Sequence, residues 1–362
     1  MRYAFYTLFF ALVFNCIASK AQDTTRFYQQ AYEIIDSMLT GKTPLNFKKA
    51  VFTTENAYFD GVLNIKKFNR EIETLIELIR IVNSSQLLKY DGTDKTDIEI
   101  QASIFEVMTD TIPIIIDSEN SLVHVPFSYD YEDMWGQKDW SKMFVSKLLY
   151  SNKGNCHSMP YLYKILAEEF QIAAYLSFAP NHIYIKQRCI KTGWYNTELT
   201  SATFPVDAWI MASGYVHLDA IRNGLYMDTL SLKQSVAYCL LDLAQGFQQK
   251  FGKSNPDFVV KCCNTVLKYH AVNVNAMLTK AEAQKRFIDT KMKAKNVKNP
   301  KELLADNSIK TMYSDMEQTY VRLHQLGYRR MPEEMYMQWM GMLKKDPEKY
   351  IDKKVIFKFD NQ

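Results

Sequence analysis

The segment around Cys156 constrains the fold of this 362-residue chain more than any other. A short polar turn, residues 151–154, leads into Cys156, and an apolar-periodic stretch follows from Met159 to Phe170. The periodicity predicts a helix, so the thiol stands at a helix N-terminus, where the helix dipole and unpaired N–H groups favour a thiolate. His182 comes 26 residues later and opens an alternating run. The chain therefore presents a potential nucleophile on a helix and a potential base on the following strand.

Strand signals continue on both sides of this histidine. Residues 173–178 and 182–186 have the apolar content and alternation of strands. Residues 191–193 are typical of a hairpin turn, and a third strand is predicted at 194–200. We therefore expect an α+β fold in which the helix bearing the cysteine packs on a small antiparallel sheet.

The rest of the chain is predicted to be mainly helical. Helical spacing of apolar residues occurs at 27–39 and 72–82, with a semi-apolar segment at 50–58 between them. Residues 86–125 are less regular, and the helical pattern returns from 231 to the end. A chain of this length is long enough for two domains, and 47% hydrophobic residues supply a full core.

The C-terminal helices are predicted to form pairs. One pair lies within 236–285, and a second is indicated by 313–326 and 332–343. Repeated helix pairs that bury small and large apolar residues on one another are typical of a helical solenoid. The Lys-rich stretch at 291–301 is predicted to be a solvated loop between helices.

The N-terminus has the features of a secretory signal peptide. Arg2 supplies the positive start, residues 6–17 the apolar run, and Ser19 and Ala21 the small residues before a cut ahead of Gln22. We therefore expect an exported protein of the periplasm or cell envelope. No later segment approaches the ~20 apolar residues of a membrane span.

Two alternatives for this segment are less favoured. A lipid anchor at Cys16 is one, but Asn15 stands where a small residue is expected before a lipid-bearing cysteine. An uncleaved signal anchor is the other.

Composition gives no support to several kinds of site. The net charge of +4, which falls to +2 without Arg2 and Lys20, does not indicate a nucleic-acid partner. No Cys-x-x-Cys pair occurs and the six histidines are scattered, so neither a metal nor a cofactor is predicted. Five cysteines remain after signal cleavage, which leaves at least one thiol outside any intramolecular disulfide. A bond from Cys239 to Cys262 or Cys263 stays open.

The segment from about 144 to 200 resembles the core of the transglutaminase-like cysteine enzymes. Gly154-Asn155-Cys156 opens a helix, His182 starts a strand, and Trp194 leads to an acidic residue on the next strand. The resemblance implies a papain/transglutaminase-like core in which Cys, His and Asp act in this chain order. Cys156 and His182 match the first two positions.

The third position departs from the family pattern. It holds Glu198 where the family has Asp, and Asn196 lies two residues earlier on the same strand face. Either side chain is a candidate to orient the imidazole. The Trp that usually follows the family's histidine is replaced by Ile183 and Tyr184.

The C-terminal part resembles tetratricopeptide (TPR) repeats. The matching anchor positions of the first and second helix are Leu243, Ala244 and Phe247, then Val259, Cys263 and Val266. The two resemblances imply a signal peptide at 1–21, N-terminal helices plus a transglutaminase-like domain at 22–225, and a TPR-like helical domain at 226–362. They also imply a surface for a protein partner on the helices.

Acyl transfer requires a nucleophile, a base and hydrogen-bond donors for the oxyanion. We expect Cys156 to be the nucleophile and His182 the base, with Glu198 or Asn196 holding the imidazole.

Side-chain donors for the oxyanion, or residues lining the substrate, are predicted at Gln137, Trp135 and Trp140. His157 points roughly 100° away from Cys156 on the helix and is predicted to be structural or substrate-lining.

The expected function is that of an exported cysteine enzyme acting on peptide or amide bonds of a peptide or protein substrate. The alternative is a catalytically inactive transglutaminase-fold protein that serves as a TPR-containing binding module of the cell envelope.

Overall fold

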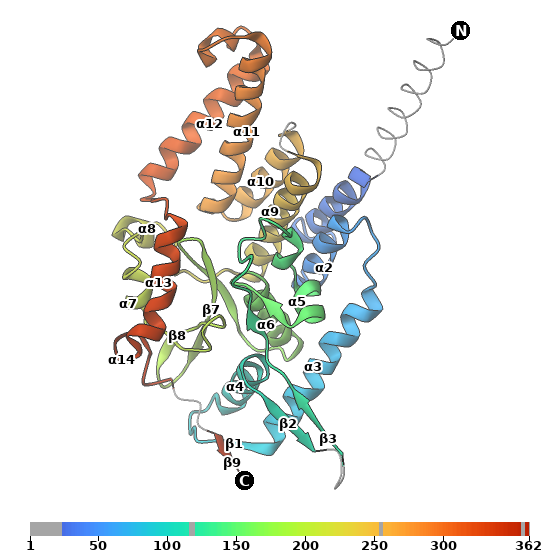
Figure 1. The fold of residues 1–362 in the computed structure, drawn as a ribbon, viewed down its shortest axis with the longest axis vertical. Coiled ribbons are helices and arrows are strands. Elements are labelled where there is room, and N and C mark those ends of the chain that lie inside the picture. Colours follow the sequence, from blue (N-terminus) through green and yellow to red (C-terminus); the bar gives the residue numbers. More distant parts are fainter. Residues whose placement is uncertain (1–23, 116–119, 253–255, 356–358, 362) are drawn as a thin grey trace, which may run out of the picture.

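The computed structural model describes residues 24–115, 120–252, 256–355 and 359–361. In these residues the protein is a mixed α+β fold, mainly helical, with several small sheets (Figure 1). The predicted signal peptide, with Cys16, lies outside the described residues. None of the helices in the described part of the chain is long and apolar enough to cross a membrane.

The described chain opens with a helix at 24–39, followed by α2 (Phe47–Tyr58) and α3 (Ile65–Ser85). Asn46 begins α2, because its side chain accepts a hydrogen bond from the Lys49 N–H at 2.7 Å and satisfies a free donor of the first turn. α3 buries an apolar stripe at helical spacing, formed by Phe68, Ile72, Leu75, Ile79 and Val82. These helices agree with the predicted segments at 27–39 and 72–82, and α3 is longer than expected.

The largest sheet of the described residues has three antiparallel strands in the order β6 (Tyr175–Ala179), β7 (His182–Cys189) and β8 (Gly193–Thr197). α6 (Ser158–Glu169) packs across β6 and β7 and is buried along most of its length. The arrangement agrees with the predicted helix on a small antiparallel sheet. The helix begins two residues after Cys156, so the thiol lies in the turn that precedes it.

Short strand pairs lie around this centre. They are β1 (Gln86–Leu88) with β9 (Phe359–Asn361), β2 (Ile112–Ile115) with β3 (Ser121–His124), and the parallel pair β4 (Ser128–Tyr129) with β5 (Lys153–Gly154). α4 (Lys95–Thr109) packs against α3 and α6 in the region that looked irregular in sequence.

Glu55 of α2 connects the N-terminal helices to the segment that leads to Cys156. Its buried carboxyl group accepts the N–H groups of Val145 and Ser146 at 2.7 and 2.9 Å. Val145 and Ser146 are the first two residues of α5 (Val145–Ser151), which follows the short 3-10 helix η1 (Trp140–Met143). Burial raises the pKa of Glu55 to about 7.

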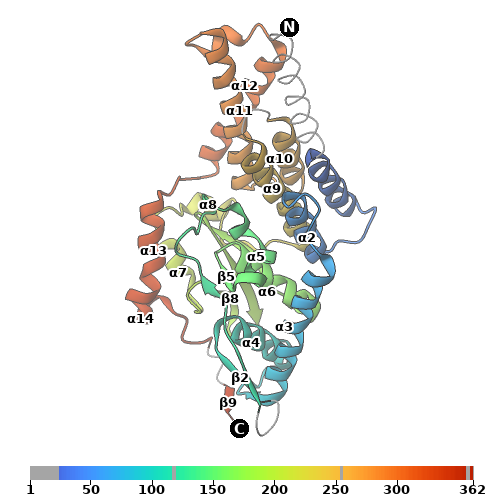
Figure 2. The same cartoon turned by 45° about the vertical axis from the view of Figure 1, so that its right-hand side comes forward.

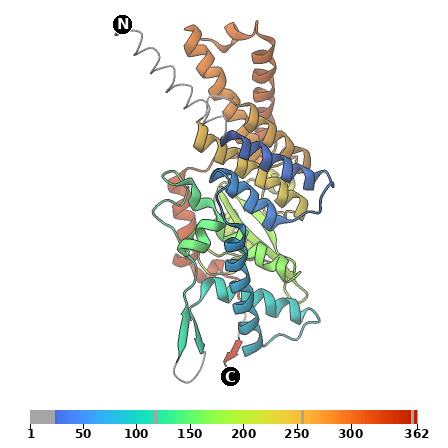
Figure 3. The same cartoon turned by 90° about the vertical axis from the view of Figure 1, so that its right-hand side faces the viewer.

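The rest of the chain is almost entirely helical. Its elements are α7 (Asp207–Met211), α8 (Leu218–Arg222), α9 (Leu232–Phe251), α10 (Asp257–Tyr269), α11 (Val274–Lys295), η2 (Pro300–Leu303), α12 (Asn307–Gln325), α13 (Glu333–Lys345) and α14 (Pro347–Tyr350). From α9 to α12, each helix packs against the next, and α2 packs against α9 (Figure 3). One hydrophobic core therefore runs from the N-terminal helices through α6 and the sheet to α9, α10 and the start of α11.

Two expectations for the C-terminal helices are wrong. α12 pairs with α11, and α13 does not form a second pair with α12. α13 instead returns to the sheet and lies beside α7 (Figures 1 and 2). The predicted loop at 291–301 is helical as far as Lys295, where α11 ends with Asn296 in the left-handed conformation.

Candidate functional site

Tight packing fixes the turn before Cys156. Gly154 forms β5, and a side chain there would meet Leu148 and Ser158 at 2.7 Å. Only glycine fits without a shift of its neighbours. The glycine carbonyl accepts the Asp130 N–H at 2.7 Å, which joins this turn to the loop before η1.

The fully buried Asn155 caps the helix that follows. Its Oδ1 accepts the N–H groups of His157 and Ser158, each at 3.0 Å. Its Nδ2 donates to the Met134 carbonyl at 3.0 Å. The same side chain therefore positions Cys156 and the loop that carries Trp135.

His182 enters the site from the two-residue turn between β6 and β7. Ala179 pairs with His182 across this turn, and Asn181 has φ +56°, a left-handed conformation that asparagine tolerates. The Asn181 carbonyl oxygen lies 4.0 Å from the Cys156 Sγ. The turn thus brings His182 close enough to Cys156 for its charge to lower the thiol pKa.

Glu198 holds the other side of the imidazole. Its Oε2 lies 2.5 Å from His182 Nε2, and its Oε1 accepts the Thr200 N–H at 2.9 Å and the Thr200 hydroxyl at 2.6 Å. Both Glu198 and His182 are almost fully buried. Thr200 therefore fixes which carboxylate oxygen faces the histidine.

Asn196, the alternative partner, does not reach His182. Its Nδ2 donates to the Pro205 carbonyl at 2.9 Å and to the Asp207 carboxylate at 2.8 Å. The register of β7 and β8 explains this, because Asn196 pairs with Lys186, four residues along β7 from the histidine. Of the two candidates, Glu198 is the residue that contacts the imidazole.

The three groups shift one another's pKa values. Burial favours the neutral thiol of Cys156, but the hydrogen bond and positive charge of His182 outweigh it and hold the thiol pKa below its usual value. Burial likewise favours neutral imidazole, yet the Glu198 charge and the bonds to Glu198 and Cys156 raise the pKa of His182 to about 10. Burial alone would raise the pKa of Glu198, but the positive charge of His182 and its hydrogen bond have the larger effect and lower the pKa of this carboxyl group. Each of the three groups therefore favours the charged form of its neighbour.

Tyr336 of α13 is a fourth member that the sequence did not reveal. Its hydroxyl lies 3.0 Å from His182 Nδ1, and its interaction with Cys156 helps to lower the thiol pKa. Trp339, one turn later, stacks on Trp209 of α7 with ring centroids 4.4 Å apart. Its ring also meets His182 edge-on at 5.6 Å.

Removing the Tyr336 hydroxyl is expected to raise the pKa of Cys156. A hydrogen bond to a charged group contributes about 1.5–3 kcal/mol, so its loss disfavours the thiolate. In Tyr336→Phe, the pH profile of iodoacetamide alkylation should move to higher pH. Tyr184→Phe is the control, because it removes another buried hydroxyl of the same hydrophobic cluster, away from Cys156. An unchanged profile in Tyr336→Phe would show that this hydroxyl does not stabilise the thiolate.

α13 also covers the site. The exposed fractions are 6% for Cys156, 3% for His182, 1% for Glu198 and 0% for Tyr336. Two reciprocal hydrogen bonds hold α13 over the imidazole. Trp339 Nε1 donates to the Trp209 carbonyl at 2.8 Å, and Trp209 Nε1 donates to the Trp339 carbonyl. α13 therefore limits access to the thiol.

The predicted oxyanion donors occupy different places. The Trp135 ring lies 4.8 Å from that of Tyr336, and its Nε1 is buried without a partner among the described residues. Trp140 lies elsewhere, with its Nε1 against Gly246 of α9. Gln137 is exposed at the edge of a cleft. Trp135 is thus the side-chain donor best placed for an oxyanion at Cys156.

His157 has a structural place. Its Nδ1 contacts the Met143 carbonyl and its Nε2 contacts Asp242 Oδ1 of α9, both at 2.9 Å. Tyr161 donates to the other oxygen of Asp242 at 2.7 Å. Burial opposes the charged imidazole, but the Asp242 carboxylate raises the His157 pKa. These contacts agree with the structural alternative for His157 and fasten α6 to α9.

The remaining thiols lie outside the site. Cys189, Cys239, Cys262 and Cys263 are free, and no disulfide forms among the described cysteines. Burial raises the pKa values of Cys239, Cys262 and Cys263. In the described residues no group of three or more His, Cys, Asp or Glu side chains could hold a metal ion.

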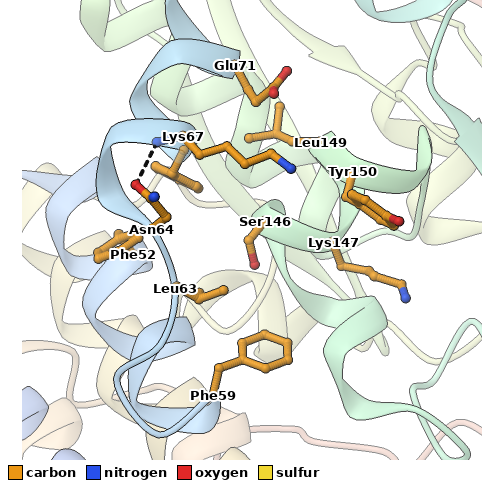
Figure 4. Close-up of a pocket in the computed structure, with 11 residues that line it drawn as sticks. Phe52, Phe59, Leu63, Asn64, Lys67, Glu71, Ser146, Lys147, Leu149 and Tyr150 are labelled. Carbon is orange, nitrogen blue, oxygen red and sulfur yellow. Dashed lines mark hydrogen bonds between the residues drawn. The ribbon is translucent and has the colours of Figure 1, made fainter.

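A separate hollow of about 470 Å³ lies between α2, α3 and α5. Figure 4 shows Phe59 and Leu63 on one wall and Tyr150 on the α5 side. None of its lining residues belongs to the Cys156 site.

Comparisons with known proteins do not identify the chain. No protein-family model matches it. No curated protein matches it either. A search of solved structures also finds no match. The functional conclusion therefore depends on the chemistry of the site.

Proposed function

We propose that this protein is an exported cysteine enzyme with a transglutaminase-like core that acts on peptide or amide bonds. The observation that carries the proposal is the buried chain from Cys156 through His182 to Glu198. A structural cysteine in an apolar core keeps its proton, as burial dictates for Cys239. At Cys156 the pKa shift runs the other way, which is typical of a nucleophile.

The reaction follows from the arrangement. The Cys156 thiolate attacks the carbonyl carbon, forming a C–S bond, and Trp135 Nε1 donates to the oxyanion. The C–N bond then breaks as the His182 imidazolium gives its proton to the leaving amine. Water or a second amine, deprotonated by His182, attacks the thioester and releases the acid or a new amide together with the thiol. Glu198 stabilises the imidazolium in both steps.

Selective alkylation tests the proposal. Cys189 is a matched internal control, since it is 7% exposed against 6% for Cys156, but its sulfur contacts the Thr192 hydroxyl rather than an imidazole. At mildly acidic pH, iodoacetamide should label Cys156 faster than Cys189, because the neighbouring His182 charge lowers the Cys156 pKa and raises its thiolate fraction. Mass spectrometry of wild type and Cys156→Ala measures the rates. Equal labelling of the two thiols would refute the assignment of Cys156 as the nucleophile.

A second candidate function is a binding module that retains this fold without turnover. The observation that favours it is the cover over the site, with the Tyr336 hydroxyl at His182 Nδ1. It predicts selective alkylation of Cys156 with no acyl-enzyme formed from a small activated ester such as p-nitrophenyl acetate. Accumulation of an acetylated Cys156 would favour the enzyme.

A further inference from the structure

A cleft of about 1000 Å³ opens beside the candidate catalytic residues. Trp135 and Asn181 line one end, and both lie at the site, since Trp135 packs on Tyr336 and the Asn181 carbonyl faces the Cys156 sulfur. The opposite wall is α11, and the connection into α13 closes the side. The cleft therefore connects the helical region with two residues that contact the Cys156 site.

The α11 wall has the length of an extended peptide. The lining residues of this helix run from Asn275 to Asp289 at helical spacing and so share one face. At 1.5 Å per residue this face is roughly 21 Å long, and an extended polypeptide covers that distance with about six residues. A compact small molecule would occupy only part of it.

The chemistry of the inner cleft suits a polypeptide backbone. Asn181, Gln245 and Asn275 use their side-chain N–H groups on Met331, Thr279 and Tyr238. The side-chain oxygens of these three amides accept no hydrogen bond from the described residues, so they remain available to the N–H groups of a bound backbone.

The outer cleft is charged. Glu282, Lys285, Arg286 and Asp289 place charges of both signs along α11, and the buried Nε of Arg286 has no partner among the described residues. Charges of both signs match polar side chains of a peptide better than the tail of a lipid.

We propose that this cleft binds an extended, polar polypeptide segment and delivers it to Cys156. The inference rests on the proposed function for the reaction at the thiol, but the binding of the segment is independent of turnover. The substrate class is thus an unfolded or flexible region of a protein rather than a free amino acid derivative.

Thr279→Trp tests the inference by filling the middle of the cleft. Thr290→Trp is the matched control, because Thr290 lies on the same helix, is exposed and does not line the cleft. Fluorescently labelled, unfolded casein is the probe, and its anisotropy is measured with the Cys156→Ala protein and with both tryptophan variants in that background. We expect at least a tenfold weaker affinity in Thr279→Trp and no change in Thr290→Trp. Equal affinities in the two variants would overturn the proposal, as would an affinity for casein too weak to measure in the parent.

A second measurement separates this inference from the proposed function. Acetylation of Cys156 by p-nitrophenyl acetate in wild type and in Thr290→Trp tests the reaction at the thiol separately, since Thr290 does not line the cleft. Casein binding that is lost in Thr279→Trp, without acetylation in any variant, would leave the cleft as a polypeptide site and refute the enzyme. Acetylation of Cys156, together with casein binding that is unchanged in Thr279→Trp, would support the enzyme and refute the polypeptide site in the cleft.

Discussion

Glu198→Gln should lower kcat/KM for a small ester or amide by roughly 10³–10⁴-fold, the scale of an equivalent acid-to-amide change in a Ser-His-Asp triad. The cause is proton placement. Thr200 donates two hydrogen bonds to Oε1, so that atom stays an acceptor and the new amide nitrogen faces His182 Nε2. The imidazole must then carry its proton on Nδ1, toward Cys156, and it cannot accept the thiol proton.

The same change should alter the pH dependence. Without the carboxylate, the pKa of His182 falls from about 10, and the pKa of Cys156 rises because its cationic partner is lost. The alkylation profile of Cys156 should therefore shift to higher pH in Glu198→Gln. Circular dichroism of the variant checks that the fold persists.

Asn196→Ala is the comparison that decides between the two acceptors. Asn196 bonds Pro205 and Asp207, so its loss should affect stability more than the pKa of the thiol. If a folded Asn196→Ala protein lost more activity than Glu198→Gln, the assignment of Glu198 would be wrong.

The sequence predicted the local parts of this site because they obey local rules. A polar turn before an apolar period placed Cys156 at a helix start, and alternation placed His182 at the head of a strand. The choice between Asn196 and Glu198 could not be made from alternation, since both lie on one face. It depends on strand register, which the structure supplies.

Tyr336 and Trp339 could not be predicted because no local rule links them to a histidine 154 residues earlier. Their helical spacing is the same in a repeat helix and in a helix that covers a site, so α13 was taken as part of a second helix pair. The feature that decides its position is the packing of Trp339 on Trp209, a contact between distant segments. The seven-residue connection from Leu326 to Pro332, which joins α12 to α13, carries no sequence signal for the direction that it takes.

The position of α13 makes the helical region part of the site rather than an appendage. Tyr336 contacts His182, α11 lines the cleft beside it, and Asp242 of α9 holds His157 next to Cys156. We therefore expect substitutions in these helices to affect the surroundings of Cys156. The Asp242–His157 contact is the one whose contribution to stability can be tested most directly.

Below about pH 6.5, Asp242→Ala is expected to lower the free energy of unfolding by about 3–5 kcal/mol, because it removes the carboxylate that favours the charged form of the buried His157 imidazole. The Tyr161 hydroxyl loses its acceptor as well. Denaturant unfolding measures the loss. Asp219→Ala is the control, since Asp219 pairs with His217 at 3.1 Å but both side chains are largely exposed. That exposed pair should contribute less than about 1 kcal/mol.

The destabilisation should also depend on pH in a definite direction. The pKa of His157 is higher in the folded protein than its ordinary value of 6.5, so its contribution to stability is fully present below about pH 6.5 and is lost as the pH rises through the folded value. The gap between wild type and Asp242→Ala should therefore be widest in mild acid and narrow in alkali. A gap that widened with rising pH would show that His157 is neutral in the folded protein, and that its bond to Asp242 is not an ion pair.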